Sequence, residues 1–195
     1  DIEILPHGET ASLIVRYRGA DRAAKPIVFL VHMDVVEANP ADWSRDPFKL
    51  VEENGYFYGR GTADVKQEVA LLTTTFLRLK AENYVPERDL IIVFTGDEET
   101  TATTAQELVT THRALIDAEY ALNSDGWGGR IDEQTGAASH YNLQGAEKSY
   151  ASFELTARNP GGHSSEPRSD NAIYELADAL QALQAFAFPV QWNDW

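Results

Sequence analysis

The sequence predicts an α/β protein with a doubly wound, mostly parallel sheet and helices on both faces. Short apolar segments of strand length alternate along the chain with segments of helical periodicity. The segment IVFLV at 27–31 is apolar throughout, as expected for a strand covered on both faces. The 195 residues are enough for one large domain, or for one domain and part of another.

The first part of the chain carries most of this alternating pattern. Its expected elements, in chain order, are strands at 11–18 and 27–31, a loop at 40–62, a helix at 65–79, a strand at 90–94, a helix at 102–116 and a strand at 120–122. Glycine and proline mark the turn between the first two strands and punctuate the loop. Within the first helix, Val65, Val69, Leu72, Phe76 and Leu79 are spaced by four, three, four and three residues, which places them on one face.

After residue 147 the pattern changes, which predicts a second layer or domain at 148–195 after a first domain at 1–147. Apolar and polar residues alternate over 151–157, as in a strand with one face in water. A glycine-containing loop at 159–167 follows, and then a helix with Ile173, Leu176, Leu180 and Leu183 on one stripe.

Composition excludes several classes of function and restricts the kind of metal site. Sixteen basic and 31 acidic residues give a net charge of −15, which argues against binding to nucleic acid or to an anionic membrane. Solubility accounts for most of this acidity, but a few acids remain available to hold cations. The absence of cysteine excludes disulfides and thiolate ligands, so a metal would need His, Asp or Glu.

The compartment is not determined by the sequence. Its apolar stretches are too short to span a bilayer, so we expect a soluble protein. The chain begins at Asp1 rather than Met, so an export signal could precede it, and both cytoplasm and periplasm stay open.

Potential metal ligands follow the expected strands. They are His32 and Asp34 after 27–31, Asp64 at the start of the long helix, Asp97, Glu98 and Glu99 after 90–94, and Asp125 after 120–122. In open α/β sheets, ligands bind outside the carboxyl ends of the strands, so we expect these side chains to share one edge. Carboxylates that converge there would repel one another unless cations lay among them. Histidine and carboxylates without thiolates suit zinc or a similar divalent metal.

Each of these positions also has an ordinary structural interpretation. His32 and Asp34 could form a simple hydrogen-bonded pair, and Asp64 could be the N-cap of the helix that follows. Asp125 lies beside glycine and could be a turn residue, whereas Glu98 and Glu99 could form the acidic first turn of the next helix. In the metal-site interpretation, one of the two adjacent glutamates binds metal and the other accepts a proton, while Asp97 shapes the turn.

Five motifs in order give the chain a resemblance to a known family. They are HMDVV at 32–36, GRGTADVK at 59–66, GDEET at 96–100, NSDG at 123–126 and NPGGHSSEP at 159–167. Together they resemble the di-zinc metallopeptidases that include glutamate carboxypeptidase, acetylornithine deacetylase, succinyl-diaminopimelate desuccinylase and aminoacylase, from about Ile27 to Ala185. The resemblance implies a zinc-exopeptidase-like catalytic domain at 1–147 and the start of an inserted α+β lid at 148–195, through which the whole protein would form a homodimer.

The same resemblance implies a role for each matching residue at a site of two divalent metal ions, zinc first, with cobalt or manganese possible. His32 and Asp125 would bind one metal, Glu99 would bind the other, and Asp64 would bridge both, with a cis peptide often found after it. Asp34 would orient the imidazole of His32, and Glu98 would be the general base. His163, which by itself reads as a solvated loop residue, would reach a partner's active site and steady the reacting carbonyl oxygen.

The chain also departs from the family pattern. Val65 and Gln67 stand where Met and often Gly are expected, and no histidine follows His163 to supply the family's last metal ligand. We therefore expect a fragment of a longer hydrolase that cleaves an amide bond next to a carboxylate, in a peptide or an N-acyl amino acid. Two alternatives stay open. One is a fragment or relative that binds metal at a half-formed site without turnover, and the other is an α/β domain whose acidic patch binds calcium or magnesium loosely.

Overall fold

The computed structural model describes residues 1–126, 128–147 and 150–192, and the chain forms two compact units, Asp1–Tyr141 and Asn142–Trp195. The division falls a few residues before the predicted domain boundary at 147/148. The assignment of the two units as a catalytic domain and the start of a lid stays a prediction.

The first unit is built on a five-stranded sheet with the order β1-β2-β6-β3-β7. Its strands are β1 (Ile2–His7), β2 (Thr10–Tyr17), β3 (Ile27–His32), β6 (Leu90–Thr95) and β7 (Tyr120–Asn123). The pairings β6/β3 and β3/β7 are parallel, whereas β1/β2 and β2/β6 are antiparallel. The α/β class is therefore confirmed. The sheet is mixed because the N-terminal hairpin adds two antiparallel pairings. Strand β6 lies between β2 and β3, the two strands that were expected to lie on either side of a single turn.

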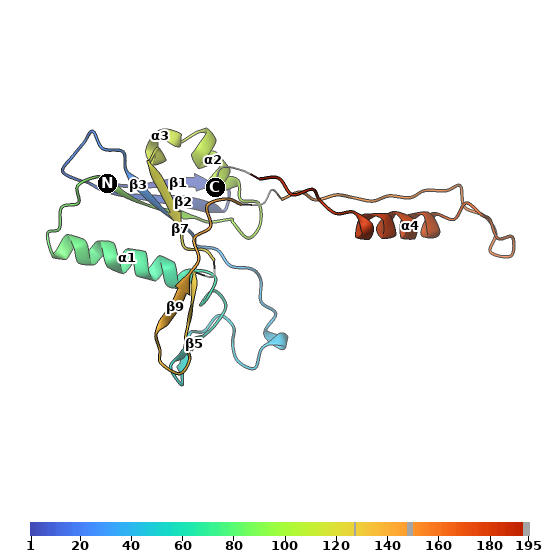
Figure 1. The fold of residues 1–195 in the computed structure, drawn as a ribbon, viewed down its shortest axis with the longest axis horizontal. Helices are drawn as coiled ribbons and strands as arrows, with labels where there is room; N and C mark the ends of the chain where they lie inside the picture. Colours follow the sequence, from blue (N-terminus) through green and yellow to red (C-terminus); the bar gives the residue numbers. More distant parts are fainter. Residues whose placement is uncertain (127, 148–149, 193–195) are drawn as a thin grey trace. The chain divides into compact units, whose positions relative to one another are not determined.

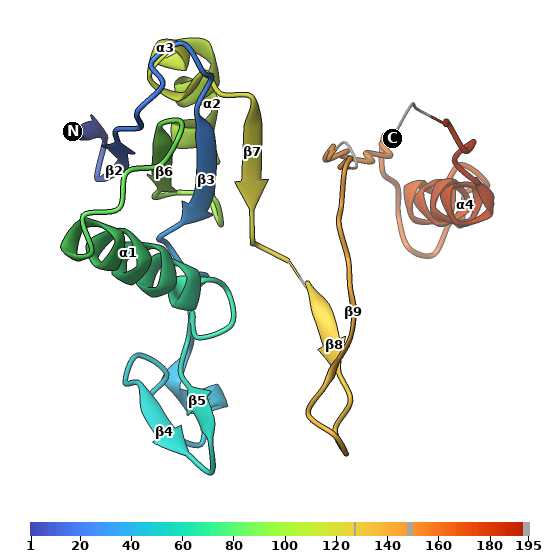
Figure 2. The same ribbon diagram turned by 60° about the vertical axis from the view of Figure 1, so that its left-hand side comes forward.

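Helices cover both faces of this sheet (Figures 1 and 2). On β6, Ile92 and Phe94 pack with Phe76 of α1 (Lys66–Ala81) on one face. Ile91 and Val93 pack with Leu108 of α2 (Thr103–Thr110) on the other face. Because successive side chains of a strand point to opposite faces, one apolar strand contributes to both cores. The helix expected at 102–116 is interrupted at Thr111 and His112, after which α3 (Arg113–Ile116) begins.

Two small hairpins were not expected from the sequence. One joins β4 (Val51–Glu53) and β5 (Tyr56–Tyr58) and lies within the segment expected to be a loop, which also contains the 3-10 helix η1 (Pro40–Asp42). The other joins β8 (Gly129–Ile131) and β9 (Ala138–Tyr141). At the first turn, Asn54 and Gly55 have φ angles of 54° and 80°, which fits the Asn-Gly pair that is typical of tight hairpins. That pair was the missed signal.

The second unit contains one helix, α4 (Ala172–Ala185), among its described residues, and this helix includes all four residues of the expected apolar stripe. The side chain of Asn171 caps it by accepting a hydrogen bond from the amide of Ile173 at 2.9 Å. The strand expected at 151–157 is wrong, because these residues form no ladder with another described segment, and all of them except the half-buried Ala157 are exposed. Alternation alone cannot make a strand without a neighbour to pair with its backbone. No helix in the described ranges is long and apolar enough to cross a membrane.

The carboxylate of Asp89 ties the start of β6 to the end of β2. It accepts hydrogen bonds from the amide of Gly19 at 2.8 Å and from the guanidinium groups of Arg16 and Arg18 at 3.1 Å each. Burial by itself would raise the pKa of Asp89, but these donors outweigh it and lower the pKa below the ordinary 3.8.

We expect Asp89→Asn to lower the free energy of unfolding at neutral pH by about 2–4 kcal/mol, since it removes the charge of a buried carboxylate that accepts three hydrogen bonds. A lowered pKa in the folded state means that the stabilisation is present above pH 3.8 and is lost as the pH falls through the folded-state value. Urea unfolding of wild type and variant from pH 7 to pH 3 should therefore show a difference that narrows on acidification. Asp21→Asn, at an exposed Asp that accepts one amide, is the control. A difference independent of pH would contradict the assignment.

Candidate metal centre

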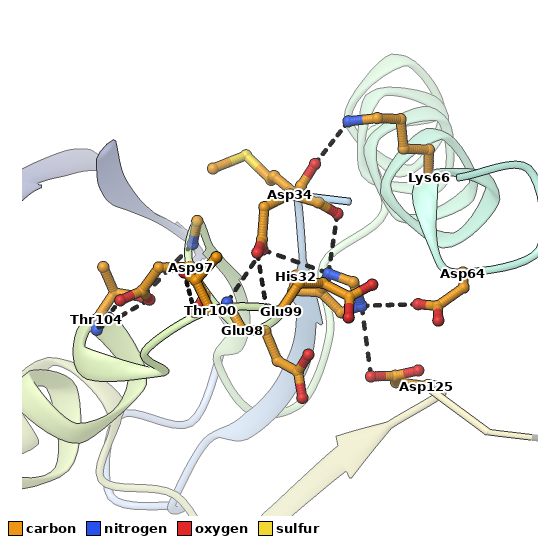
Figure 3. Close-up of polar contacts among 12 residues, drawn as sticks. His32, Asp34, Asp64, Lys66, Asp97, Glu98, Glu99, Thr100, Thr104 and Asp125 are labelled. Atoms are coloured by element: carbon orange, nitrogen blue, oxygen red, sulfur yellow. Dashed lines mark hydrogen bonds and ion pairs between the residues drawn. The ribbon is translucent and has the colours of Figure 1, made fainter. Parts of the chain in front are cut away.

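Three potential ligands converge at the carboxyl ends of the parallel strands (Figure 3). His32 is the last residue of β3, Asp125 follows β7, and Asp64 lies just before α1. The Nε2 atom of His32 lies 2.9 Å from Oδ1 of Asp64 and 3.5 Å from Oδ2 of Asp125. One donor atom from each residue lies within 4.8 Å of the other two. The parallel pairing explains this, because Ile27 of β3 is in register with Tyr120 of β7, so both strands end at the same edge.

The site has a buried imidazole and more exposed carboxylates. The side chain of His32 is 2% exposed, whereas those of Asp125 and Asp64 are 29% and 64% exposed. Burial by itself would lower the pKa of His32. The hydrogen bond that the imidazole donates to the carboxylate of Asp64 and the negative charges of Asp125, Asp34 and Glu98 outweigh burial, so the pKa is raised. The surroundings therefore favour a positive charge at this point.

Glu98 lies in the same electrostatic environment. Burial is the largest cause that raises the pKa of Glu98, and the negative charges of Asp125, Glu99 and Asp34 act in the same direction. The positive charge of His32 acts against them. The pKa of Glu98 therefore depends on the charges of both the imidazole and the acids of the site.

Asp97 is structural, as expected. Its buried carboxylate accepts hydrogen bonds from the amides of Thr103 at 2.8 Å and Thr104 at 3.1 Å, and from the hydroxyl of Thr101 at 2.5 Å. Burial would raise the pKa of Asp97, but these donors lower it. A carboxylate at the N-terminus of α2 is also favoured by the helix dipole. The run of threonines after GDEE was the sequence signal for this hydroxyl-rich cap, and it was missed.

The structure tests the ordinary structural interpretations of four residues, namely Asp64, Glu98, Glu99 and Asp125. The N-cap of α1 is Val65, without a side-chain hydrogen bond, so Asp64 is not a capping residue, and the peptide bond between them is cis. Helix α2 begins at Thr103, so Glu98 and Glu99 precede its first turn. The amide of Asp125 does belong to a turn, where it donates to Oδ1 of Asn123 at 2.8 Å, but its carboxylate faces His32.

Besides Asp34 and Glu98, two further predicted site residues lie outside the three-residue cluster of His32, Asp64 and Asp125. Glu99 is absent from it, although it lies on the adjacent β6–α2 loop. His163 belongs to the other compact unit, where it is exposed and its Nδ1 lies 2.7 Å from the hydroxyl oxygen of Ser165. The roles assigned to both residues stay predictions.

The chemistry of the cluster fits a divalent metal. It offers one imidazole nitrogen and two carboxylate oxygens, the donor types that zinc, cobalt and manganese accept. Nδ1 of His32 has a separate partner, the main-chain oxygen of Asp34 at 3.1 Å, which leaves Nε2 directed at the carboxylates. A hydrogen bond at the other ring nitrogen is the usual way in which a protein fixes the tautomer of a metal-binding histidine.

An α/β sheet that gathers an imidazole and carboxylates at the carboxyl ends of its strands is an arrangement typical of metal-dependent hydrolases. The comparison with protein families shows which family of hydrolases this is. The profile of peptidase family M20/M25/M40 matches residues 28–187, and the chain belongs to this family of metallopeptidases. The resemblance seen in the five sequence motifs is thereby confirmed.

Curated relatives cover nearly the whole chain. It is 36% identical over 179 residues to a probable succinyl-diaminopimelate desuccinylase of Staphylococcus aureus, covering 90% of this chain and 41% of that protein. It is 29% identical over 187 residues to the human N-fatty-acyl-amino acid synthase/hydrolase PM20D1, covering 93% of this chain and 36% of the relative. The chain thus spans about two-fifths of the length of these relatives.

Solved structures support the fold. Human carnosine dipeptidase 1 matches 67% of this chain, and 30% of its own, with a TM-score of 0.59 and 23% identity. The M20 family metallo-carboxypeptidase Sso-CP2 of Sulfolobus solfataricus matches 69% of this chain, and 30% of its own, with a TM-score of 0.57 and 19% identity.

Proposed function

We propose that the whole protein is a metal-dependent hydrolase that cleaves an amide bond next to a carboxylate, in a C-terminal peptide bond or an N-acyl amino acid. The observation that carries this proposal is the convergence of His32, Asp64 and Asp125 at the end of the parallel strands, with Glu98 beside them. Relatives named as a desuccinylase and as an N-fatty-acyl-amino acid synthase/hydrolase support it, since both names describe acylated amino acids.

The residues of this chain would hold two divalent metal ions, with zinc preferred and cobalt or manganese as alternatives. His32 and Asp125 would be ligands of one ion, Glu99 would be a ligand of the other, and Asp64 would contribute to both. Bound metal would supply Lewis acidity, which makes water a better nucleophile and the scissile carbonyl a better electrophile.

Glu98 then moves the proton. It accepts a proton from the attacking water while the water oxygen bonds to the carbonyl carbon, and it gives that proton to the amine nitrogen as the C–N bond breaks. One water is consumed, and one carboxylic acid and one amine are released. His163, from the lid of a partner subunit in a homodimer, steadies the carbonyl oxygen.

The test is a substrate panel on the whole gene product with metal removed and restored. We expect hydrolysis of N-acyl amino acids or dipeptides, loss of nearly all activity after chelation and dialysis, and recovery with zinc, cobalt or manganese. N-acyl amino acid amides, which lack the free carboxylate, are the matched control and should be poor substrates. Activity that survives complete metal removal, measured by elemental analysis, would contradict the proposal.

A second candidate is metal binding without turnover at a half-formed site. It is favoured by one observation: among the described residues, the donors gather into a single three-residue group that does not include Glu99. This candidate predicts that both the 195-residue chain and the whole gene product bind zinc but hydrolyse no member of the panel. Activity of the whole product alone would restrict this interpretation to the shorter chain.

A further inference from the structure

The two carboxylate oxygens of Asp34 hold two consecutive backbone amides on another strand's loop. Oδ1 accepts a hydrogen bond from the amide of Glu98 at 3.1 Å, and Oδ2 accepts one from the amide of Glu99 at 2.9 Å (Figure 3). Asp34 follows β3, whereas Glu98 and Glu99 follow β6. One side chain therefore joins the ends of two neighbouring parallel strands at the site.

The contact of Asp34 with His32 is different in kind. Nδ1 of His32 lies 3.1 Å from the main-chain oxygen of Asp34 and 3.4 Å from carboxylate Oδ1. The nearer acceptor is the main chain, which a substitution of the side chain leaves in place. The carboxylate, in contrast, accepts a hydrogen bond from the Glu99 amide at 2.9 Å, a shorter distance than the 3.4 Å between Oδ1 and the imidazole.

We infer that Asp34 is a positioning residue that acts chiefly on the backbone of Glu98 and Glu99, and only secondarily on the imidazole. Its effect on catalysis rests on the proposed function of these two glutamates. Two adjacent amides held by one planar carboxylate fix the direction in which both side chains leave the backbone. Asp97 holds the same loop from its other side, through the N-terminus of α2.

No other described group competes for this role. Asp34 is the one acceptor recorded in the described part of the chain for the amides of Glu98 and Glu99. Its side chain is 18% exposed, so water can replace it only in part. Asparagine has the same shape but a single carbonyl oxygen, and its NH₂ group would face one of the two N–H donors. Asp34→Asn should therefore release at least one amide.

Asp132 provides a matched control. A single oxygen, Oδ1, accepts both the amide of Gln134 at 2.9 Å and the amide of Thr135 at 2.8 Å in the β8–β9 turn. Asparagine can keep both hydrogen bonds with its one carbonyl oxygen, so Asp132→Asn removes the same charge without the same loss of acceptors.

The experiment is hydrogen–deuterium exchange of the whole protein, resolved to single residues by fragmentation mass spectrometry. In the wild type we expect the amides of Glu98 and Glu99 to be protected. In Asp34→Asn at least one of them should exchange about tenfold faster or more, while amides within β3 and β6 keep their protection. In Asp132→Asn the amides of Gln134 and Thr135 should change little. Unprotected Glu98 and Glu99 amides in the wild type would overturn the inference without any variant.

Kinetics and metal content separate this role from that of an imidazole-orienting residue. For Asp34→Asn we expect kcat to fall on the order of 10²-fold with little change in KM, and the zinc ion assigned to His32 to be retained, so that any loss of zinc is confined to the ion assigned to Glu99. Loss of zinc with unchanged exchange at Glu98 and Glu99 would show that Asp34 acts on His32, and would overturn the inference. If the wild type hydrolyses nothing in the substrate panel, the proposed function fails, but the exchange result still tests the contact.

Discussion

Glu98→Gln in the whole protein is expected to lower kcat by ~10²–10⁴-fold, the range typical of losing a general base, while metal content stays near the wild-type value. Glutamine keeps the size of the side chain but cannot accept and return a proton. Glu98 lies outside the His32, Asp64 and Asp125 cluster, so its loss should not remove a ligand from that group. Its location in the loop before α2, away from the apolar cores, makes a collapse of the fold unexpected.

The measurement is steady-state hydrolysis of the best panel substrate, with zinc determined by elemental analysis of the same samples. Glu3→Gln, at an exposed position of β1, is the control for loss of one glutamate and should retain full activity. If Glu98→Gln keeps more than about a tenth of the activity, Glu98 is not the base. Activity lost in parallel with zinc would instead indicate a ligand.

His32→Ala should have the largest effect on metal binding. It removes the one imidazole of the cluster, and it leaves the carboxylates of Asp64 and Asp125 to repel each other without the imidazole beside them. Loss of an outer hydrogen-bond partner already lowers metal affinity by about 10–100-fold, so loss of a ligand should lower it by more than about 100-fold. Activity should fall with the bound metal.

Titration with zinc in the presence of a competing chelator would measure this change. His7→Ala is the matched control, because Nδ1 of His7 also pairs with a carboxylate, that of Glu107 at 3.0 Å, away from the site. Circular dichroism should show that both variants stay folded. Zinc affinity equal to that of wild type in His32→Ala would remove His32 from the site and, with it, the central observation behind the proposed function.

Local patterns predicted the elements that carry strong periodicity. The 4-3-4-3 spacing from Val65 to Leu79 located α1 closely, and the apolar runs at 27–31 and 90–94 located β3 and β6. The prediction of a strand at 151–157 was wrong because alternation of apolar and polar residues predicts which side chains share a face, but it does not provide a neighbouring strand. The described part of the chain has no strand paired with these residues. The β4–β5 hairpin was missed although its Asn54-Gly55 turn was readable.

The convergence of His32, Asp64 and Asp125 was predictable, because parallel strands bring their carboxyl ends to one edge whatever else the fold does. The hydrogen bonds and contacts within the site were not predictable in the same way. Whether Asp64 caps α1 or faces His32 depends on a backbone path that residue types do not specify, and the structure directs it to His32. The hydrogen bonds of Asp34 to two amides join residues more than sixty positions apart.

The sequence by itself determined the α/β class, the family and the kinds of ligand available, since these depend on periodicity, ordered motifs and the absence of cysteine. Only the tertiary structure decided that β6 inserts between β2 and β3, that His32, Asp64 and Asp125 face one another, and that Asp34 holds the loop of Glu98 and Glu99. The physical reason is distance along the chain. Local propensity acts over a few residues, whereas a metal site and a carboxylate between strands depend on strand order and register.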